Sequence, residues 1–223
     1  AGSVSEGVKN VRTKQFQDFV DDFHLKGKKI IEIGCGRGEY LEFMNNTGAN
    51  AYGLEHRKES VEDCRAKGLK VIQGFLNDPS EKIEHGPFDA FFICNFLEHF
   101  DEPSLALRAI ANNLTDDGIG FVEVPNTDNI IDKTSFYKFT LEHLLNFTKE
   151  TLTSTLRNNG FDVLSCEIIQ TGSGAPIYAL VRKKKPLNFD KFKNNQKVLY
   201  EEIDSFLKQF DKEKTVIWGA GHH

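Results

Sequence analysis

The sequence has few of the residues on which several classes of protein depend. Among its 223 residues are one Met, one Trp and four Cys. The cysteines (Cys35, Cys64, Cys94 and Cys166) are widely scattered, with no C-x-x-C pair and no nearby His at ligand spacing. This pattern argues against a structural zinc site and fits reduced thiols. We therefore expect a cytoplasmic protein with no bound metal.

Long apolar runs and an excess of positive charge are missing as well. No apolar run approaches the ~20 residues of a membrane span, and no signal peptide is recognisable. The formal net charge is -5, whereas a nucleic-acid surface needs a basic face. The one basic run, 182–185, follows a strand-like segment and is best explained as a solvated strand end. Neither a membrane nor a nucleic acid is an expected partner.

Apolar segments that suit strands alternate with segments that suit helices. A helix is expected ahead of the first strand, from its apolar positions Val11, Phe16, Phe19, Val20 and Phe23. Parallel strands are then expected at about 28–33, 51–55, 69–73, 88–94 and 119–124, with helices between them. A helix from Thr148 to Asn159 precedes two strands, 161–169 and 176–181, which should pair antiparallel. The pattern predicts an α/β fold: a doubly wound, mostly parallel seven-stranded sheet with an antiparallel C-terminal hairpin.

Four regions follow from this pattern. They are an N-terminal helical segment (1–27), a cofactor-binding domain (28–185), a long helix or linker (186–213) and the opening of a second Rossmann-like domain (214–223), which we expect to be truncated. The first residue is not Met, so we expect a processed or trimmed chain. The long helix, 189–210, carries an apolar stripe that favours packing or a homodimer.

The most informative segment is a glycine loop after the first strand. Gly34, Gly36 and Gly38 follow an apolar run ending in Glu32-Ile33, and glycines let a ligand approach the backbone closely. A dinucleotide turn reads G-x-G-x-x-G, but its third glycine position here is Glu39. A carboxylate is a poor neighbour for a pyrophosphate and suits a cationic ligand such as S-adenosylmethionine. A nicotinamide-dependent dehydrogenase is therefore the less favoured alternative.

The ends of the other strands offer matching groups. Glu55 ends the second strand, where a carboxylate can accept hydrogen bonds from both ribose hydroxyls, or merely cap the next helix. Phe75 and Leu76 follow the third strand and suit an adenine face, although core packing explains them equally well. Asn95 follows the fourth strand, beside Leu97-Glu98-His99.

Together these residues resemble the class I S-adenosylmethionine-dependent methyltransferases. The matching pieces are Glu32–Gly38, Glu55, the block 88–99 and Leu114–Gly118, within a resemblance that spans roughly 11–183. It implies a Rossmann-like fold with S-adenosyl-L-methionine as cofactor. The predicted cofactor-binding residues are Glu32, Gly34, Cys35, Gly36, Gly38, Glu55, Phe75, Leu76 and Asn95.

A narrower resemblance is to the sugar C-methyltransferases, which act on nucleotide-linked deoxysugars. It is carried by Glu123-Val124-Pro125, by Glu142-His143-Leu144, and by Trp218–Gly221, which is similar to the start of that family's second domain. The family's N-terminal zinc module is absent here, and its Tyr-His-Glu-His motif reads Thr140-Leu141-Glu142-His143. Tyr137 or Tyr178 is a candidate to replace the missing tyrosine.

Methyl transfer needs mainly in-line positioning of the acceptor, together with a base where the acceptor carries a proton. His143, with Glu142 beside it, is the first candidate base, and His99 is the second. Either histidine is also explained as a structural residue of a loop. We expect transfer to a small molecule, which would be a nucleotide-linked or other sugar metabolite. The alternatives are an O- or N-methyltransferase of another substrate and a cofactor-binding module without catalysis.

Overall fold

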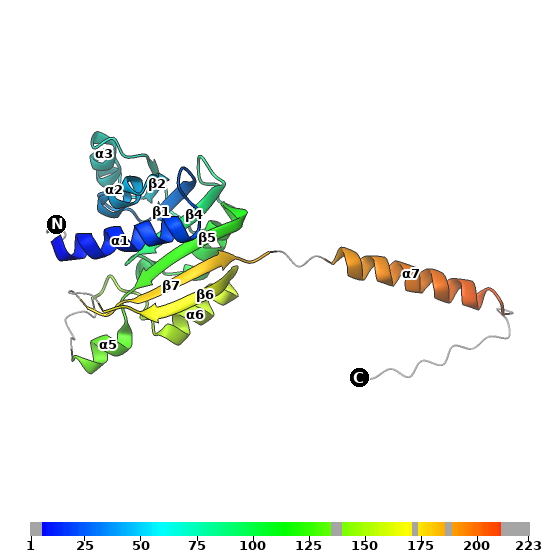
Figure 1. The fold of residues 1–223 in the computed structure, drawn as a ribbon. Coiled ribbons are helices and arrows are strands. Elements are labelled where there is room, and N and C mark those ends of the chain that lie inside the picture. Colours follow the sequence, from blue (N-terminus) through cyan, green and yellow to red (C-terminus); the bar gives the residue numbers. More distant parts are fainter. Residues whose placement is uncertain (1–5, 135–139, 171–173, 186–188, 211–223) are drawn as a thin grey trace. The chain divides into compact units, whose positions relative to one another are not determined.

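The computed structural model describes residues 6–134, 140–170, 174–185 and 189–210. The chain divides into two compact units, 1–185 and 186–223, each of which is described by itself. The first unit is built on one twisted sheet (Figure 1), whose strand order is β3-β2-β1-β4-β5-β7-β6. Among the helices described, none is both long and apolar enough to cross a membrane.

The sheet combines parallel strands with an antiparallel C-terminal hairpin, as predicted. Its strands are β1 Lys29–Ile33, β2 Asn50–Glu55, β3 Val71–Gln73, β4 Phe88–Cys94, β5 Leu114–Val124, β6 Phe161–Ile168 and β7 Ile177–Lys183. The pairs from β3 to β5 are parallel, whereas β7 runs antiparallel to both β5 and β6. The strand order steps away in both directions from β1 and β4, which places a topological switch point between them. The predicted doubly wound fold with its antiparallel hairpin is confirmed.

Helices cover both faces of this sheet. They are α1 Glu6–Asp22, α2 Glu39–Asn46, α3 Lys58–Ala66, the 3-10 turn η1 Leu97–His99, α4 Pro103–Asn112, α5 Thr127–Asp132 and α6 Lys149–Asn158. One core cluster joins α1, α2 and α3 to the sheet, for instance through Phe16 and Met44. The other joins α4 and α6 to the opposite face, through residues such as Leu107 and Leu152. Because both faces are covered, β4 is buried along almost its whole length.

Several predicted boundaries were wrong. Val11 is 41% exposed and does not belong to the buried face of α1, and Phe23 lies just beyond its end. β3 is only three residues long. β5 begins at Leu114 rather than at 119, because a bulge between the Phe88–Leu114 and Ala90–Ile119 pairs absorbs the expected turn. We also missed α5, which is six residues long and too short for a helical period.

The second unit contains the helix α7, Asp190–Leu207. Most of its apolar residues are exposed within that unit, for instance Leu199 at 54% and Phe206 at 58%. The segment 214–223, predicted to open a second domain, lies outside the described residues.

Candidate functional site

The glycine loop lies at the carboxyl end of β1 and is fastened to β2. The backbone N–H groups of Gly34 and Cys35 both donate to the Leu54 carbonyl, at 2.9 and 3.1 Å. Gly34, Gly36 and Gly38 have φ angles of +74°, +52° and +83°, a region that side chains rarely adopt. The loop therefore needs glycine at all three positions for its own shape, before any ligand is considered.

Glu55 links this loop to the end of β2. Its side chain is 2% exposed, and the carboxylate accepts the Gly36 N–H at 3.0 Å and the Arg57 N–H at 2.8 Å. His56 lies beside it, with Nδ1 3.2 Å from a carboxylate oxygen. Glu55 therefore supports the backbone at the start of α3, as one of the two predicted roles requires, and it also holds the glycine loop; its role toward a ribose stays a prediction.

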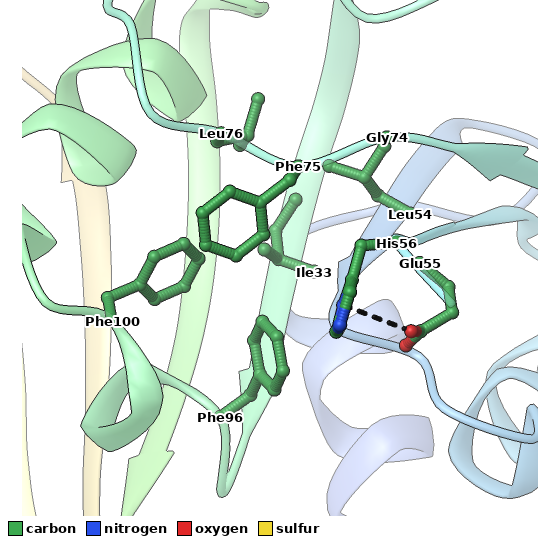
Figure 2. A pocket seen from close by; sticks show the side chains of 10 residues that line it. Ile33, Leu54, Glu55, His56, Gly74, Phe75, Leu76, Phe96 and Phe100 are labelled. Atoms are coloured by element: carbon green, nitrogen blue, oxygen red, sulfur yellow. Dashed lines mark ion pairs between the residues drawn. The ribbon is translucent and has the colours of Figure 1, made fainter. Parts of the chain in front are cut away.

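A small apolar cavity lies next to these residues (Figure 2). Its volume is about 10 Å³. Residues on its lining, besides Gly34 and Glu55, are His56, Phe75, Leu76, Phe96 and Phe100. The Phe75 and Phe100 rings stack at 5.2 Å, and a Cβ on Gly34 would overlap the Phe96 ring. Nucleoside-sized ligands need several hundred Å³, so binding one here requires the aromatic side chains to move.

The other predicted cofactor residues occupy different positions around the loop. Leu76 lines the cavity and also belongs to the core. Cys35 is not among the cavity-lining residues, and its side chain packs where Gly53 leaves room. Glu32 is buried outside the cavity lining, and burial raises the pKa of its carboxyl well above the usual range. Asn95 is exposed, with φ +50°, and donates to the Glu123 carboxylate at 3.1 Å.

A buried ion pair near the end of β4 was not anticipated from the sequence. Arg12 of α1 pairs with Glu123 of β5, and its guanidinium lies 4.7 Å from the centre of the Tyr40 ring. Its Nε and Nη1 atoms are buried and have no hydrogen-bond partner among the described residues. Two free guanidinium nitrogens suit a carboxylate ligand. No local motif marks Arg12, because its partner Glu123 is 111 residues away in the sequence.

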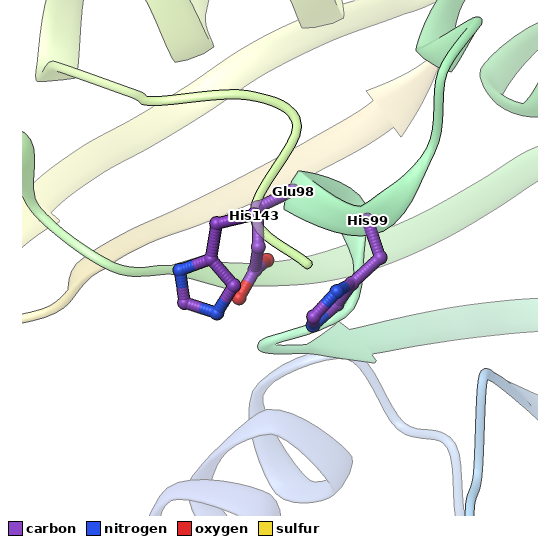
Figure 3. A group of neighbouring side chains, drawn as sticks. All are labelled: Glu98, His99 and His143. Atoms are coloured by element: carbon purple, nitrogen blue, oxygen red, sulfur yellow. The ribbon is translucent and has the colours of Figure 1, made fainter. Parts of the chain in front are cut away.

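The structure brings together both predicted histidines with Glu98 (Figure 3). The rings of His99 and His143 are 5.0 Å apart and meet edge to face. One ligand-type atom of each of the three residues lies within 4.8 Å of the others. The Leu145 N–H donates to the Glu98 carbonyl at 3.1 Å, which fastens the segment that carries His143 to η1. The end of β4 and the loop before α6 therefore lie together at one edge of the sheet.

The charge state of this group follows from burial. Glu98 is 1% exposed, and burial raises the pKa of its carboxyl to about 7. The pKa of His143 is lowered by burial and by the neighbouring His99. The His99 Nδ1 lies 2.7 Å from the Glu142 carbonyl, and since a carbonyl only accepts, Nδ1 carries the proton and Nε2 has the free lone pair.

Two details differ from the sequence-based expectation. Glu142 contributes its backbone carbonyl, while its side chain is exposed. The carboxylate beside the histidines is that of Glu98, which we had not predicted as a site residue. Tyr178 packs at 4.5 Å against Phe121 in the α1-side core, and it is not part of this group; Tyr137 lies outside the described residues.

Comparison with known proteins shows to which family the chain belongs. A family model described as a methyltransferase domain matches residues 9–166. The chain belongs to this methyltransferase family. The prediction of a class I S-adenosylmethionine-dependent methyltransferase, with that cofactor, is thereby confirmed at the level of the family. Membership in the sugar C-methyltransferase subfamily is not shown.

Similar sequences and structures agree with this assignment. A ubiquinone biosynthesis O-methyltransferase of Vibrio parahaemolyticus is 32% identical over 93 residues, 39% of each chain. One of Neisseria meningitidis is 29% identical over 49% of each chain. The chain thus spans less than half the length of these curated relatives. Magnesium protoporphyrin IX methyltransferase of Synechocystis, solved with S-adenosylhomocysteine, shares the fold, with a TM-score of 0.62, 16% identity and coverage of 82% of this chain and 90% of its own.

Proposed function

We propose that this methyltransferase transfers a methyl group from S-adenosylmethionine to a hydroxyl oxygen of a small molecule. The observation that carries the proposal is the placement of the histidine pair, His99 and His143, at the end of β4, the strand next to the one that leads into the glycine loop. Ligands of open α/β sheets bind at this edge. The names of the relatives, which are O-methyltransferases, support an oxygen acceptor.

The residues around the loop suit the chemistry of this cofactor. Glu55 would accept the ribose hydroxyls, and Phe75 would offer an aromatic face to the adenine. Arg12 would donate one of its unpaired N–H groups to the carboxylate of the methionine end. The sulfonium supplies an electrophilic methyl group when the cofactor is bound; the chain itself has to position the acceptor and remove its proton.

Removal of that proton is a task for the histidines. Because the pKa of His143 is lowered, its imidazole is neutral at pH 7, which is the form that can accept a proton. The free Nε2 of His99 lies in the same group. One or both would take the hydroxyl proton as the methyl group leaves sulfur for oxygen.

A sugar acceptor is the second candidate. It is favoured by the segment Glu142-His143-Leu144, which is similar to the sugar C-methyltransferases. Incubation with S-adenosylmethionine carrying a tritiated methyl group would separate the candidates, using a panel of hydroxylated aromatic compounds and a panel of nucleotide-linked deoxysugars. Label in the aromatic panel supports the first proposal, label on a sugar carbon supports the second, and label on a sugar oxygen supports an O-methyltransferase that acts on a sugar.

Binding and catalysis are tested apart from each other. Calorimetric titration with S-adenosylhomocysteine should give a micromolar Kd, with NADH as the negative control. If S-adenosylhomocysteine does not bind to the folded protein, the proposal fails. If it binds and both panels stay unlabelled, the chain is better explained as a cofactor-binding module, which is the third candidate.

We also propose that α7 pairs with a second copy of itself. Leu199, Ile203 and Phe206 recur at steps of four and three residues, the spacing of a coiled-coil seam, and all are exposed within their unit. Sedimentation of the protein against a Leu199→Asp variant tests this, since the dimer should be lost. The four thiols are buried and free, which supports a reducing compartment.

A further inference from the structure

We propose that Glu98, His99 and His143 bind a divalent transition-metal ion, and that this ion holds the acceptor oxygen during methyl transfer. The metal site rests on the geometry of these three side chains alone. Its use for the acceptor rests on the proposed function. The proposal reverses our sequence-based expectation that no metal is bound.

The first observation is convergence. Figure 3 shows the Glu98 carboxylate and the two imidazole rings projecting to the same side of η1, with their ligand-type atoms all within 4.8 Å of one another. Around one ion with bonds of about 2.0–2.2 Å, ligand atoms lie about 3–3.6 Å apart. Small rotations of the three side chains therefore suffice to bring them onto a common ion.

The second observation is a buried carboxylate without a counter-charge. Glu98 is 1% exposed, and neither of its carboxylate oxygens has a hydrogen-bond partner among the described residues. By contrast, Glu123 is equally buried but is paired with Arg12. Buried charges are ordinarily paired or bound to metal. A bound cation would supply the partner that this buried carboxylate lacks.

The third observation is the hydrogen bond that His99 makes with the segment carrying His143. The His99 Nδ1–H donates to the Glu142 carbonyl at 2.7 Å, which leaves the Nε2 lone pair free. Metal-binding histidines almost always use their second nitrogen in this way.

The donor set indicates the class of ion. Two imidazoles and one carboxylate suit Zn²⁺, Mn²⁺, Fe²⁺ or Co²⁺ better than Mg²⁺, which prefers oxygen ligands. Three protein ligands also leave coordination positions open, as in catalytic rather than structural sites. We therefore expect the acceptor hydroxyl to complete the coordination of the ion.

Such an ion would replace a free histidine as the means of activating the acceptor. Bound to a divalent ion, a hydroxyl has a lowered pKa and releases its proton to solvent. The resulting oxygen forms the new C–O bond while the S–C bond breaks, which leaves S-adenosylhomocysteine. The ion neither gains nor loses electrons, so no oxidant or reductant is needed.

The test is direct titration of metal-free protein with Co²⁺, followed by its visible absorption, and with Zn²⁺ by calorimetry. Every sample carries His222→Ser and His223→Ser, because two adjacent histidines bind these ions themselves. The variants are Glu98→Gln, His99→Ala and His143→Ala. The matched control is His24→Asn, a change at an exposed histidine outside the cluster, whose φ of +54° asparagine tolerates.

We expect one equivalent of ion to bind, with at least a 100-fold weaker Kd in each of the three variants and no change in the control. Circular dichroism establishes that each variant is folded. Absence of binding by the folded protein, or equal binding by the three variants, would overturn the proposal. Titration with S-adenosylhomocysteine in parallel keeps the two proposals apart: if it binds and the metal does not, only the metal site fails, and the reverse result removes only the methyltransferase function.

Discussion

Replacement of Glu55 by Gln is the sharpest test of how the glycine loop and the cofactor are held. In the structure the carboxylate accepts two backbone N–H groups, from Gly36 and Arg57. An amide of the same shape has only one oxygen, so its NH₂ group must face one of the two donors. A buried N–H then loses its partner, which costs about 1–3 kcal/mol.

The same change removes the charge that we expect to bind the ribose. Hydrogen bonds to a charged group contribute about 1.5–3 kcal/mol each. Loss of one such bond corresponds to about a 10- to 150-fold increase in Kd, since 1.4 kcal/mol is a factor of ten. We therefore expect Glu55→Gln to weaken the binding of S-adenosylhomocysteine by one to two orders of magnitude, measured by calorimetry.

The control is Glu59→Gln, an exposed carboxylate in the first turn of α3. It should leave the Kd within about a factor of two, because surface substitutions rarely exceed 0.5 kcal/mol. Urea unfolding of both variants separates a folding defect from a binding defect. A Kd for Glu55→Gln within threefold of the unaltered protein would refute the reasoning, since the carboxylate would then serve only to support the backbone.

Three further predictions follow from the site. Gly34→Ala should abolish cofactor binding and lower stability by about 1–2 kcal/mol at least, because its φ is +74° and its Cβ would overlap Phe96; calorimetry and thermal unfolding measure both, and unchanged binding would contradict the role of the loop. Phe96→Ala should increase the association rate of S-adenosylhomocysteine in stopped-flow experiments, because this ring lines the cavity of about 10 Å³ and lies against Gly34, so its removal widens the cavity; an unchanged or slower rate would show that the ring does not obstruct entry. In metal-free protein, the pKa of Glu98 is about 7 when folded and near 4.5 when unfolded, so the unfolded chain releases this proton first. The free energy of unfolding should therefore fall by about 3 kcal/mol between pH 4.5 and 7, at about 1.4 kcal/mol per unit; Glu98→Gln should lose this component, and identical pH profiles would refute it.

The sequence predicted the fold closely because local signals agreed with one another. Alternating strand and helix patterns, glycines at turns and a helix-free link between the last two strands leave little freedom in a doubly wound sheet. Where the signals were weak, the prediction was poor. The turn at 116–118 proved to be a bulge within β5, and α5 was too short to show a period.

Part of the site was also readable from the chain. Gly34, Gly36 and Gly38 lie in one short loop, and Glu55 ends a recognisable strand, so its place beside that loop follows from parallel pairing of neighbouring strands. Residues of this kind are predictable because the physical constraint is local: a loop with positive φ angles needs glycine, and a strand end next to it presents one side chain.

Only the tertiary structure decided which distant side chains meet. The pairing of Arg12 with Glu123 depends on how α1 packs on one face of the sheet, and the meeting of Glu98 with His143 depends on where the segment before α6 lies. The sequence determined that carboxylates and histidines were available, and in what order. Burial in the folded chain then set their chemical properties. For Glu98, the loss of solvent raises the pKa of the carboxyl and leaves its two oxygens without a hydrogen-bond partner in the part of the chain that the structure describes.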